Sequence, residues 1–243
     1  EAVYMICHYS IVTSLLDRLK MFVLRADVTF RLRCDLVVIY HNAGAKLTQF
    51  SNLDIDPSGP AWPKECFNDS KSSQSARLIV LPVADAIKFI GAIEAHITLF
   101  NSDYWNLLQI RHGVVSITAS TSSLFTPQNL NLDLIAGVSF TKGCYPGQEI
   151  VARLRYLGRV KQRLLRGWIK GESQVRAGQS VTLVDSKDEK VGVIVNASTL
   201  TGVGTECLLS VYGFLETNNV YCPTDQPSKH ITNLPLPYQL QLT

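Results

Sequence analysis

Several common signatures are missing from this 243-residue chain, and each absence excludes a class of protein. The longest apolar runs are the size of a strand, as at 36–40, whereas a membrane-spanning helix needs roughly 18 residues. The six cysteines form no CxxC pair, and the five histidines form no HxxxH or HExxH pattern. The nucleotide and hydrolase motifs GxxxxGK(S/T), GxGxxG and GxSxG are absent or incomplete. We therefore expect a cytoplasmic protein without a membrane contact, a metal site or a common enzyme centre.

Charged residues are few, at 18%, whereas hydrophobic residues make up 46% and can supply a folded core. The net charge of +3 is too small to indicate a nucleic-acid partner by itself. Its distribution is uneven, because residues 142–170 contain eight basic residues and one acid, a local charge of +7. The basic residues are Lys142, Arg153, Arg155, Arg159, Lys161, Arg163, Arg166 and Lys170. Such a stretch fits either a solvated basic surface or an anionic partner.

Hydrophobic spacing predicts a mixed helix and strand region followed by an all-β region. The expected helices cover 10–24, 84–97, 103–112 and 148–157. The expected strands cover 28–30, 35–41, 77–83, 164–169, 180–184, 191–195 and 207–212. Short strands joined by turns near the end of the chain are typical of a small β-barrel or sandwich, with a boundary near residue 160. Because the chain opens at Glu1 without a signal peptide, we expect it to be part of a longer protein.

One segment, Lys142–Glu149, holds two glycines, a proline, a thiol, a lysine and a carboxylate within eight residues. Residues 145–148 fit a type II turn, since proline presets φ at the second position and glycine tolerates a positive φ at the third. A helix that begins after this turn would aim its unsatisfied N–H groups toward Cys144 and, with Lys142, favour the thiolate. The alternative is a structural cysteine in an ordinary loop.

The other cysteines lie in different settings. Three occur in apolar or strand-like runs, where burial is expected to keep them inert: Cys7, Cys34 and Cys207. Two occur in polar, proline-containing stretches and are expected to be accessible, with no helix start behind them: Cys66 and Cys222. The sequence therefore predicts that Cys144 is the most reactive thiol.

The same segment carries a family resemblance. Residues 137–153 resemble the signature of the YgfZ family, whose motif K-G-C-Y-x-G-Q-E is filled at every fixed position by 142–149. The agreement continues upstream through 125–128 and 131–132, and reappears at 234–238, which resembles the family's closing segment. The family comprises folate-binding relatives of the glycine-cleavage T protein, an aminomethyltransferase.

The resemblance implies an α+β fold similar to YgfZ and the T protein, with two α+β domains and a small C-terminal β-barrel around a central folate-binding hole. We expect 1–34 to be the remainder of one α+β domain, whose N-terminal part is missing. Residues 35–158 are then the folate-binding α+β domain with the cysteine motif, and 159–243 the barrel domain.

The resemblance also implies a function. The chain is expected to be a tetrahydrofolate-binding factor for assembly or repair of iron–sulfur proteins, including enzymes that methylthiolate tRNA, with Cys144 as functional thiol and Lys142 and Glu149 beside it. Its partners are folate and iron–sulfur proteins or their assembly machinery, and we expect a monomer without direct RNA contact. An enzyme is not expected, since no catalytic carboxylate is identifiable. Two alternatives stay open: a folate-dependent one-carbon transferase, and an RNA-contacting module through 153–170.

Five residues are candidate folate contacts by this resemblance. Trp105 matches the tryptophan implicated in folate binding, where an indole face stacks on an aromatic ring, although core packing on a helix is the alternative. Tyr145, Gln148 and Arg153 belong to the motif segment. Relatives usually carry I-E-A-G-x-P after the helix, but here Arg111 replaces the glutamate. A guanidinium cannot accept the pterin's hydrogen bonds and instead suits a polyglutamate tail.

Overall fold

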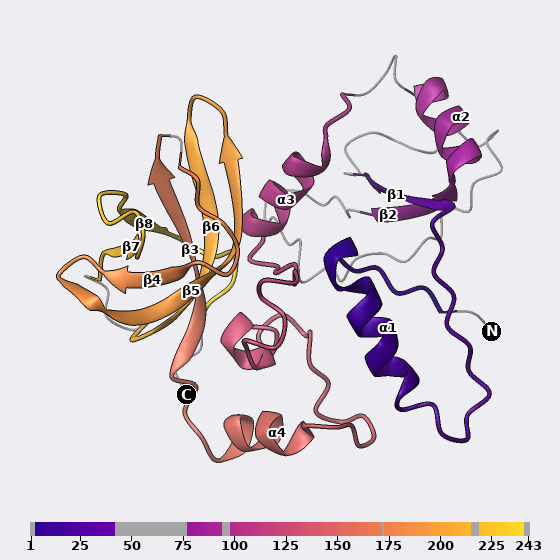
Figure 1. Ribbon diagram of the computed structural model, residues 1–243, viewed down its shortest axis with the longest axis horizontal. Coiled ribbons are helices and arrows are strands. Elements are labelled where there is room, and N and C mark those ends of the chain that lie inside the picture. Colours follow the sequence, from indigo (N-terminus) through magenta and orange to yellow (C-terminus); the bar gives the residue numbers. More distant parts are fainter. Residues whose placement is uncertain (1–2, 42–76, 94–97, 172, 215–218, 241–243) are drawn as a thin grey trace. The chain divides into compact units, whose positions relative to one another are not determined.

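The computed structural model describes residues 3–41, 77–93, 98–171, 173–214 and 219–240 (Figure 1). The chain divides into two compact units, one formed by Arg18–Trp105 and the other by Glu1–Asp17 with Asn106–Thr243. The expected domain boundaries after residues 34 and 158 stay predictions. Within the described ranges, every helix is too short or too polar to cross a bilayer.

The smaller unit contains a two-stranded antiparallel sheet covered by a helix. Strand β1 (Leu36–His41) pairs with β2 (Arg77–Pro82), and α2 (Val83–Ile93) follows β2 directly. Alternate residues of both strands share one face and pack with α2: Val37, Ile39, Ile79, Leu81, Ala86 and Phe89. The predicted strands and helix are confirmed here, while 94–97 at the expected helix end lie outside the described residues.

Two predictions near the N-terminus need correction. The helix expected over 10–24 is shorter, because a 3-10 turn η1 (Tyr9–Ile11) precedes α1 (Val12–Lys20) and the chain turns away after it. The strand expected over 28–30 is wrong. The N–H of Val28 bonds back to the carbonyl of Ala26 at 3.0 Å, a local turn contact rather than a strand ladder.

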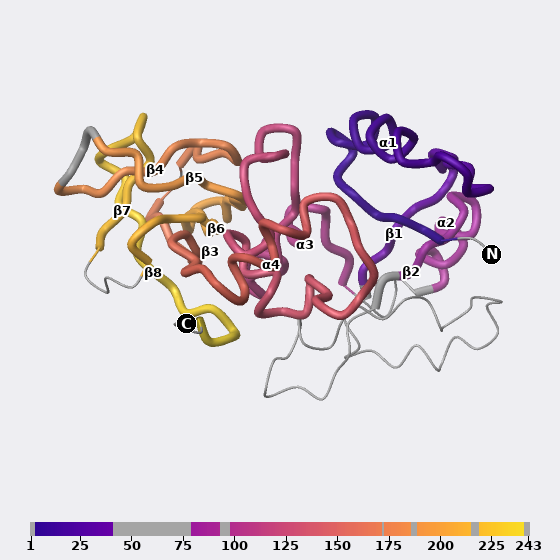
Figure 2. The backbone as a smooth tube through the Cα atoms, turned by 90° about the horizontal axis from the view of Figure 1, so that it is seen from below, coloured from indigo at the N-terminus to yellow at the C-terminus, as the bar shows by residue number. Residues whose placement is uncertain are grey.

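The larger unit contains a closed six-stranded barrel, which confirms the predicted all-β region. Its strands are β3 (Gln162–Lys170), β4 (Ser180–Leu183), β5 (Ser186–Leu200), β6 (Gly204–Tyr212), β7 (Tyr221–Pro223) and β8 (Ile231–Leu234). They are antiparallel in the order β3-β6-β5-β4-β7-β8, and β8 pairs back onto β3 to close the ring (Figures 1 and 2). Strands β7 and β8 were not predicted.

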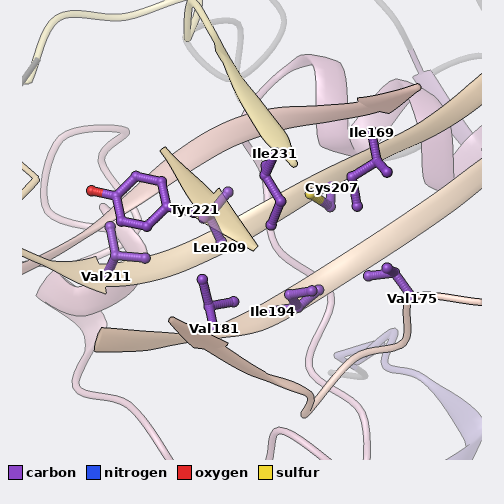
Figure 3. Packing of buried hydrophobic residues seen from close by; sticks show 9 residues of the cluster. All are labelled: Ile169, Val175, Val181, Ile194, Cys207, Leu209, Val211, Tyr221 and Ile231. Atoms are coloured by element: carbon purple, nitrogen blue, oxygen red, sulfur yellow. The ribbon is translucent and has the colours of Figure 1, made fainter. Parts of the chain in front are cut away.

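Alternate side chains point into the barrel and form its core (Figure 3). The core residues are Ile169, Val175, Val181, Ile194, Cys207, Leu209, Val211, Tyr221 and Ile231. Cys207 is buried as predicted, and that burial raises the pKa of its thiol to about 12. This thiol is therefore neutral and inert at physiological pH.

The outer face of the barrel is also covered on one side. Strand β6 is buried along nearly its whole length, because its outward residues pack against the segment that precedes the barrel. This outer cluster joins Leu164, Val195 and Leu208 of the barrel to two residues of that segment, Ile110 and Leu130. They belong to α3 (Ser102–Arg111) and the 3-10 turn η4 (Pro127–Leu130), so the barrel wall is the platform for 106–138.

Candidate functional site around Cys144

The turn predicted at residues 145–148 is present. The N–H of Gln148 donates to the carbonyl oxygen of Tyr145 at 3.2 Å, and Gly147 has φ of 84° and ψ of 4°, as the third residue of a type II turn requires. Helix α4 (Gln148–Tyr156) begins directly after this glycine. Glu149 lies in the first turn of the helix, where a carboxylate complements the helix dipole.

Cys144 lies on the exposed loop just before this turn. The ammonium of the neighbouring Lys142 lies 4.6 Å from the centroid of the Tyr145 ring, a cation–π contact inside the same loop. The N–H of Lys142 donates to Ser139 Oγ at 3.2 Å. The cation–π contact therefore joins Lys142 and Tyr145, which precede and follow Cys144 in the sequence.

Gln148 has a local role in this loop. Its side-chain Oε1 accepts the N–H of Tyr145 at 3.2 Å, so the turn is closed by a main-chain and a side-chain hydrogen bond in opposite directions. The amide oxygen is used within the loop, which leaves the amide nitrogen as the group of Gln148 that suits a ligand.

A buried glutamine ties α4 to the barrel platform. Gln128 of η4 donates from Nε2 to the carbonyl oxygen of Val151 at 2.7 Å, and both residues are buried. The main-chain carbonyl of Gln128 accepts Arg163 Nη1 at 3.1 Å, and the same nitrogen contacts Asp133 at 2.6 Å. The Arg163–Asp133 pair is only 3–4% exposed, so one buried ion pair fixes the turn that holds α4.

Asn131 joins two further segments. It has φ of 57°, a left-handed conformation that asparagine tolerates, and its side chain exchanges hydrogen bonds with both main-chain groups of Leu164. The same amide contacts the Tyr238 hydroxyl at 3.4 Å, and that hydroxyl donates to the carbonyl oxygen of Gly113 at 2.9 Å. The segments 131–132 and 234–238, which resemble the family in sequence, thus meet in space.

Arg111 is paired within the larger unit. Its guanidinium donates to Glu206 Oε1 from Nε at 2.9 Å and from Nη2 at 2.8 Å. Arg166 makes the equivalent double contact with Glu206 Oε2 at 3.1 and 2.7 Å. Glu206 is only 4% exposed and lies between both guanidiniums, while Arg111 is 41% exposed. The polyglutamate contact expected of Arg111 stays a prediction, and the Arg111 guanidinium is already paired with Glu206.

Trp105 belongs to the smaller unit. Its ring is half-buried and lies 4.5 Å from the Tyr40 ring, measured between centroids, with the planes tilted by 46°. Burial, with a smaller effect from Tyr104, raises the pKa of Tyr40. Trp105 is therefore part of an aromatic pair and retains some exposed ring surface.

The motif residues lie together, whereas the other candidates lie elsewhere. The loop and first turns of α4 contain Lys142, Cys144, Tyr145, Gln148, Glu149 and Arg153. Arg111 is on α3, and Trp105 is on the part of α3 assigned to the other unit. In the described ranges, no three His, Cys, Asp or Glu side chains gather as a metal site would require.

The predicted settings of three cysteines are wrong. Cys7 and Cys34 are exposed, because their segments lie outside any helix or strand. Cys222 is buried because β7 places it in the barrel wall, where its sulfur contacts Thr182 Oγ1 at 3.4 Å. Cys66 lies outside the described residues.

Comparison with known proteins identifies the relatives of this chain. Over 166 residues, 67% of the chain, it is 32% identical to the tRNA-modifying protein YgfZ of Pectobacterium carotovorum subsp. carotovorum, covering 49% of that protein. It is 30% identical to the protein of the same name from Edwardsiella ictaluri over 182 residues, 73% of the chain and 51% of the relative. The protein of that name from Colwellia psychrerythraea is 45% identical over 95 residues, 38% of the chain and 28% of the relative. No family profile matches the chain.

The chain belongs to the YgfZ family. It spans about half the length, or less, of these curated relatives. Two residues important to the architecture of this YgfZ chain were not singled out from the sequence, Gln128 and Glu206. Glu206 is the one charged residue in β6, and this was the available signal, since a buried acid requires a partner.

Proposed function

We propose that this protein is a tetrahydrofolate-binding accessory factor for the assembly or repair of iron–sulfur proteins, including those that methylthiolate tRNA. The relatives are named tRNA-modifying proteins, which supports a role related to tRNA modification. The observation that carries the proposal is the exposed Cys144 directly before a preformed type II turn at the start of α4. We further propose an arrangement of two α+β domains and a barrel, as in the T protein.

The loop suits a thiol that reacts with a partner. Cys144 is exposed on the loop that precedes the first turn of α4, so its thiol is accessible to a partner. A single thiolate cannot hold an iron–sulfur cluster, which takes four ligands. Cys144 therefore acts on a partner's cluster, sulfur or thiol rather than holding a resident cluster.

The chemistry of the side chains fits a folate. Within the smaller unit, the half-buried indole of Trp105 is the candidate ring for stacking on the pterin or benzoyl ring. Tyr145 is half-buried beside Lys142 and offers a hydroxyl. Folate would supply a one-carbon carrier at this protein. The described residues hold no observation that favours the one-carbon transferase alternative.

Titration with tetrahydrofolate, followed by protein fluorescence or calorimetry, tests the cofactor assignment. We expect saturable binding, weakened about 2- to 10-fold by Trp105→Ala, the range for loss of an aromatic pair. Trp168→Phe on β3 is the control and should leave the affinity unchanged. Absence of binding, or equal loss in both variants, would contradict this part of the proposal.

A further inference from the structure

The structure divides the basic stretch 142–170 into two groups. Arg163 and Arg166 bind buried carboxylates and belong to the architecture of the larger unit. Five others are exposed on the motif loop, on α4 and just after it: Lys142, Arg153, Arg155, Arg159 and Lys161. These five make no ion pair with any residue that the structure describes, and Glu149 is the one acid in 139–161. We name this basic region the α4 surface.

Aromatic rings lie among these cations. The Arg155 guanidinium lies 5.2 Å from the centroid of the Phe140 ring. The rings of Phe140 and Tyr156 form an edge-to-face pair, with their centroids 6.2 Å apart. Tyr156 is 68% exposed at the end of α4. With the Lys142–Tyr145 contact, the α4 surface carries two cation–π pairs and one exposed ring.

Helical spacing separates the two sides of α4. Val151 is buried, and its carbonyl accepts the Gln128 amide, so this side of the helix is anchored. Arg153 and Tyr156 are three residues apart and both exposed, which places them as neighbours on another side. A cation and an aromatic ring are therefore presented together by a helix whose buried side is fixed.

We propose that the α4 surface binds single-stranded RNA, in place of the expectation from the sequence that the chain makes no direct RNA contact. Guanidinium and ammonium groups neutralise phosphates, and an exposed tyrosine ring provides a face on which an unpaired base stacks. This combination is the one that proteins use for single strands, whereas a shallow basic patch without rings offers charge alone. The names of the relatives include tRNA modification, and single-stranded loops and ends are where tRNA bases can be reached.

A basic helix with exposed apolar residues also suits an anionic membrane surface. The observations favour RNA, because α4 has only nine residues and its aromatic rings are arranged with cations rather than as one continuous apolar stripe. The RNA proposal rests neither on folate binding nor on the reactivity of Cys144.

The test is fluorescence anisotropy of a labelled 12-nucleotide oligouridylate with the 243-residue chain at several salt concentrations. We expect log Kd to rise with log salt by roughly 0.7 per phosphate contact. The double variant Arg153→Ala/Arg155→Ala should lower this slope by roughly 1.4, because it removes two contacts. Tyr156→Ala should weaken binding about 5- to 100-fold with little change of slope, as expected for loss of base stacking.

The matched control is Arg176→Ala/Lys190→Ala, which removes the same charge from exposed positions of the larger unit outside the α4 surface. It should bind nearly as wild type. Equal weakening in both double variants would mean general charge attraction and would overturn the proposal. Undetectable or salt-independent RNA binding would also overturn it, as would binding to phosphatidylserine vesicles without binding to the oligonucleotide.

Discussion

The side-chain amide of Gln128 holds the carbonyl oxygen of Val151 at 2.7 Å, and this contact fixes helix α4 on the barrel platform. The main chain of Gln128 is itself bonded by Arg163 of β3, which is paired with Asp133. The motif loop is thus connected to the barrel through one buried polar chain. The Oε1 atom of Gln128 is buried without a partner among the described residues.

Replacement of Gln128 tests this connection. Gln128→Ala removes the amide and should lower the free energy of unfolding by about 1–3 kcal/mol, as measured by urea denaturation. Hydrogen exchange in α4 should accelerate more than exchange in the barrel strands, because the lost contact reaches the helix directly. Gln174→Ala at an exposed position is the control and should change neither. Unchanged exchange in α4 would show that the helix is held by other contacts.

The Glu206 carboxylate should be more important for stability than either arginine that binds it. Glu206→Ala leaves two guanidiniums without their buried partner and should cost about 3–5 kcal/mol in unfolding free energy. Arg111→Ala should cost less, because Arg111 is 41% exposed and Arg166 still neutralises the acid. Chemical denaturation of both variants measures the difference. An equal or larger loss in Arg111→Ala would contradict this ranking.

Cys144 should be the most reactive thiol of the folded protein. Brief iodoacetamide treatment at mildly acidic pH, with peptide mass mapping, should label Cys144 before the exposed Cys7 and Cys34. Cys144 has the motif Lys142 two residues away, whereas no lysine or arginine lies within two residues of Cys7, and Arg33 beside Cys34 is paired with Asp35. Cys207 and Cys222 are buried and should react only after unfolding, and the pKa of Cys207, about 12, keeps it a thiol. Faster labelling of Cys7, Cys34 or Cys66 would show that the motif loop does not activate its cysteine.

Local sequence chemistry predicted the features that depend on neighbouring residues. The Pro146–Gly147 pair defines the turn, and the α4 boundary follows from it, since Gly147 has the positive φ that the third position requires. The longer barrel strands also follow from their apolar alternation. Strand β4 is equally short but alternates polar and apolar residues, whereas β7 ends in Pro223 and β8 has two adjacent polar residues, Thr232 and Asn233. The placement of β7 and β8 depends on their pairing with β4 and β3.

Long-range pairing explains what the sequence could not predict. Arg166 looks like part of a basic patch in the sequence, but it is paired with Glu206, 40 residues away. Cys222 lies in a polar stretch, yet β7 places it in the barrel wall. In both cases the environment of the side chain is created by an element distant in the chain, so the composition of the neighbouring residues predicts the wrong exposure.

The role of the Cys144 thiol is tested most directly by complementation of a bacterium that lacks its YgfZ protein, with tRNA methylthiolation measured by mass spectrometry. The protein and its Cys34→Ser variant should both restore methylthiolation. Cys144→Ser should fail although it is present at the same level, because serine keeps the shape of the loop without thiol chemistry. Restoration by Cys144→Ser would contradict the account and make the motif cysteine structural.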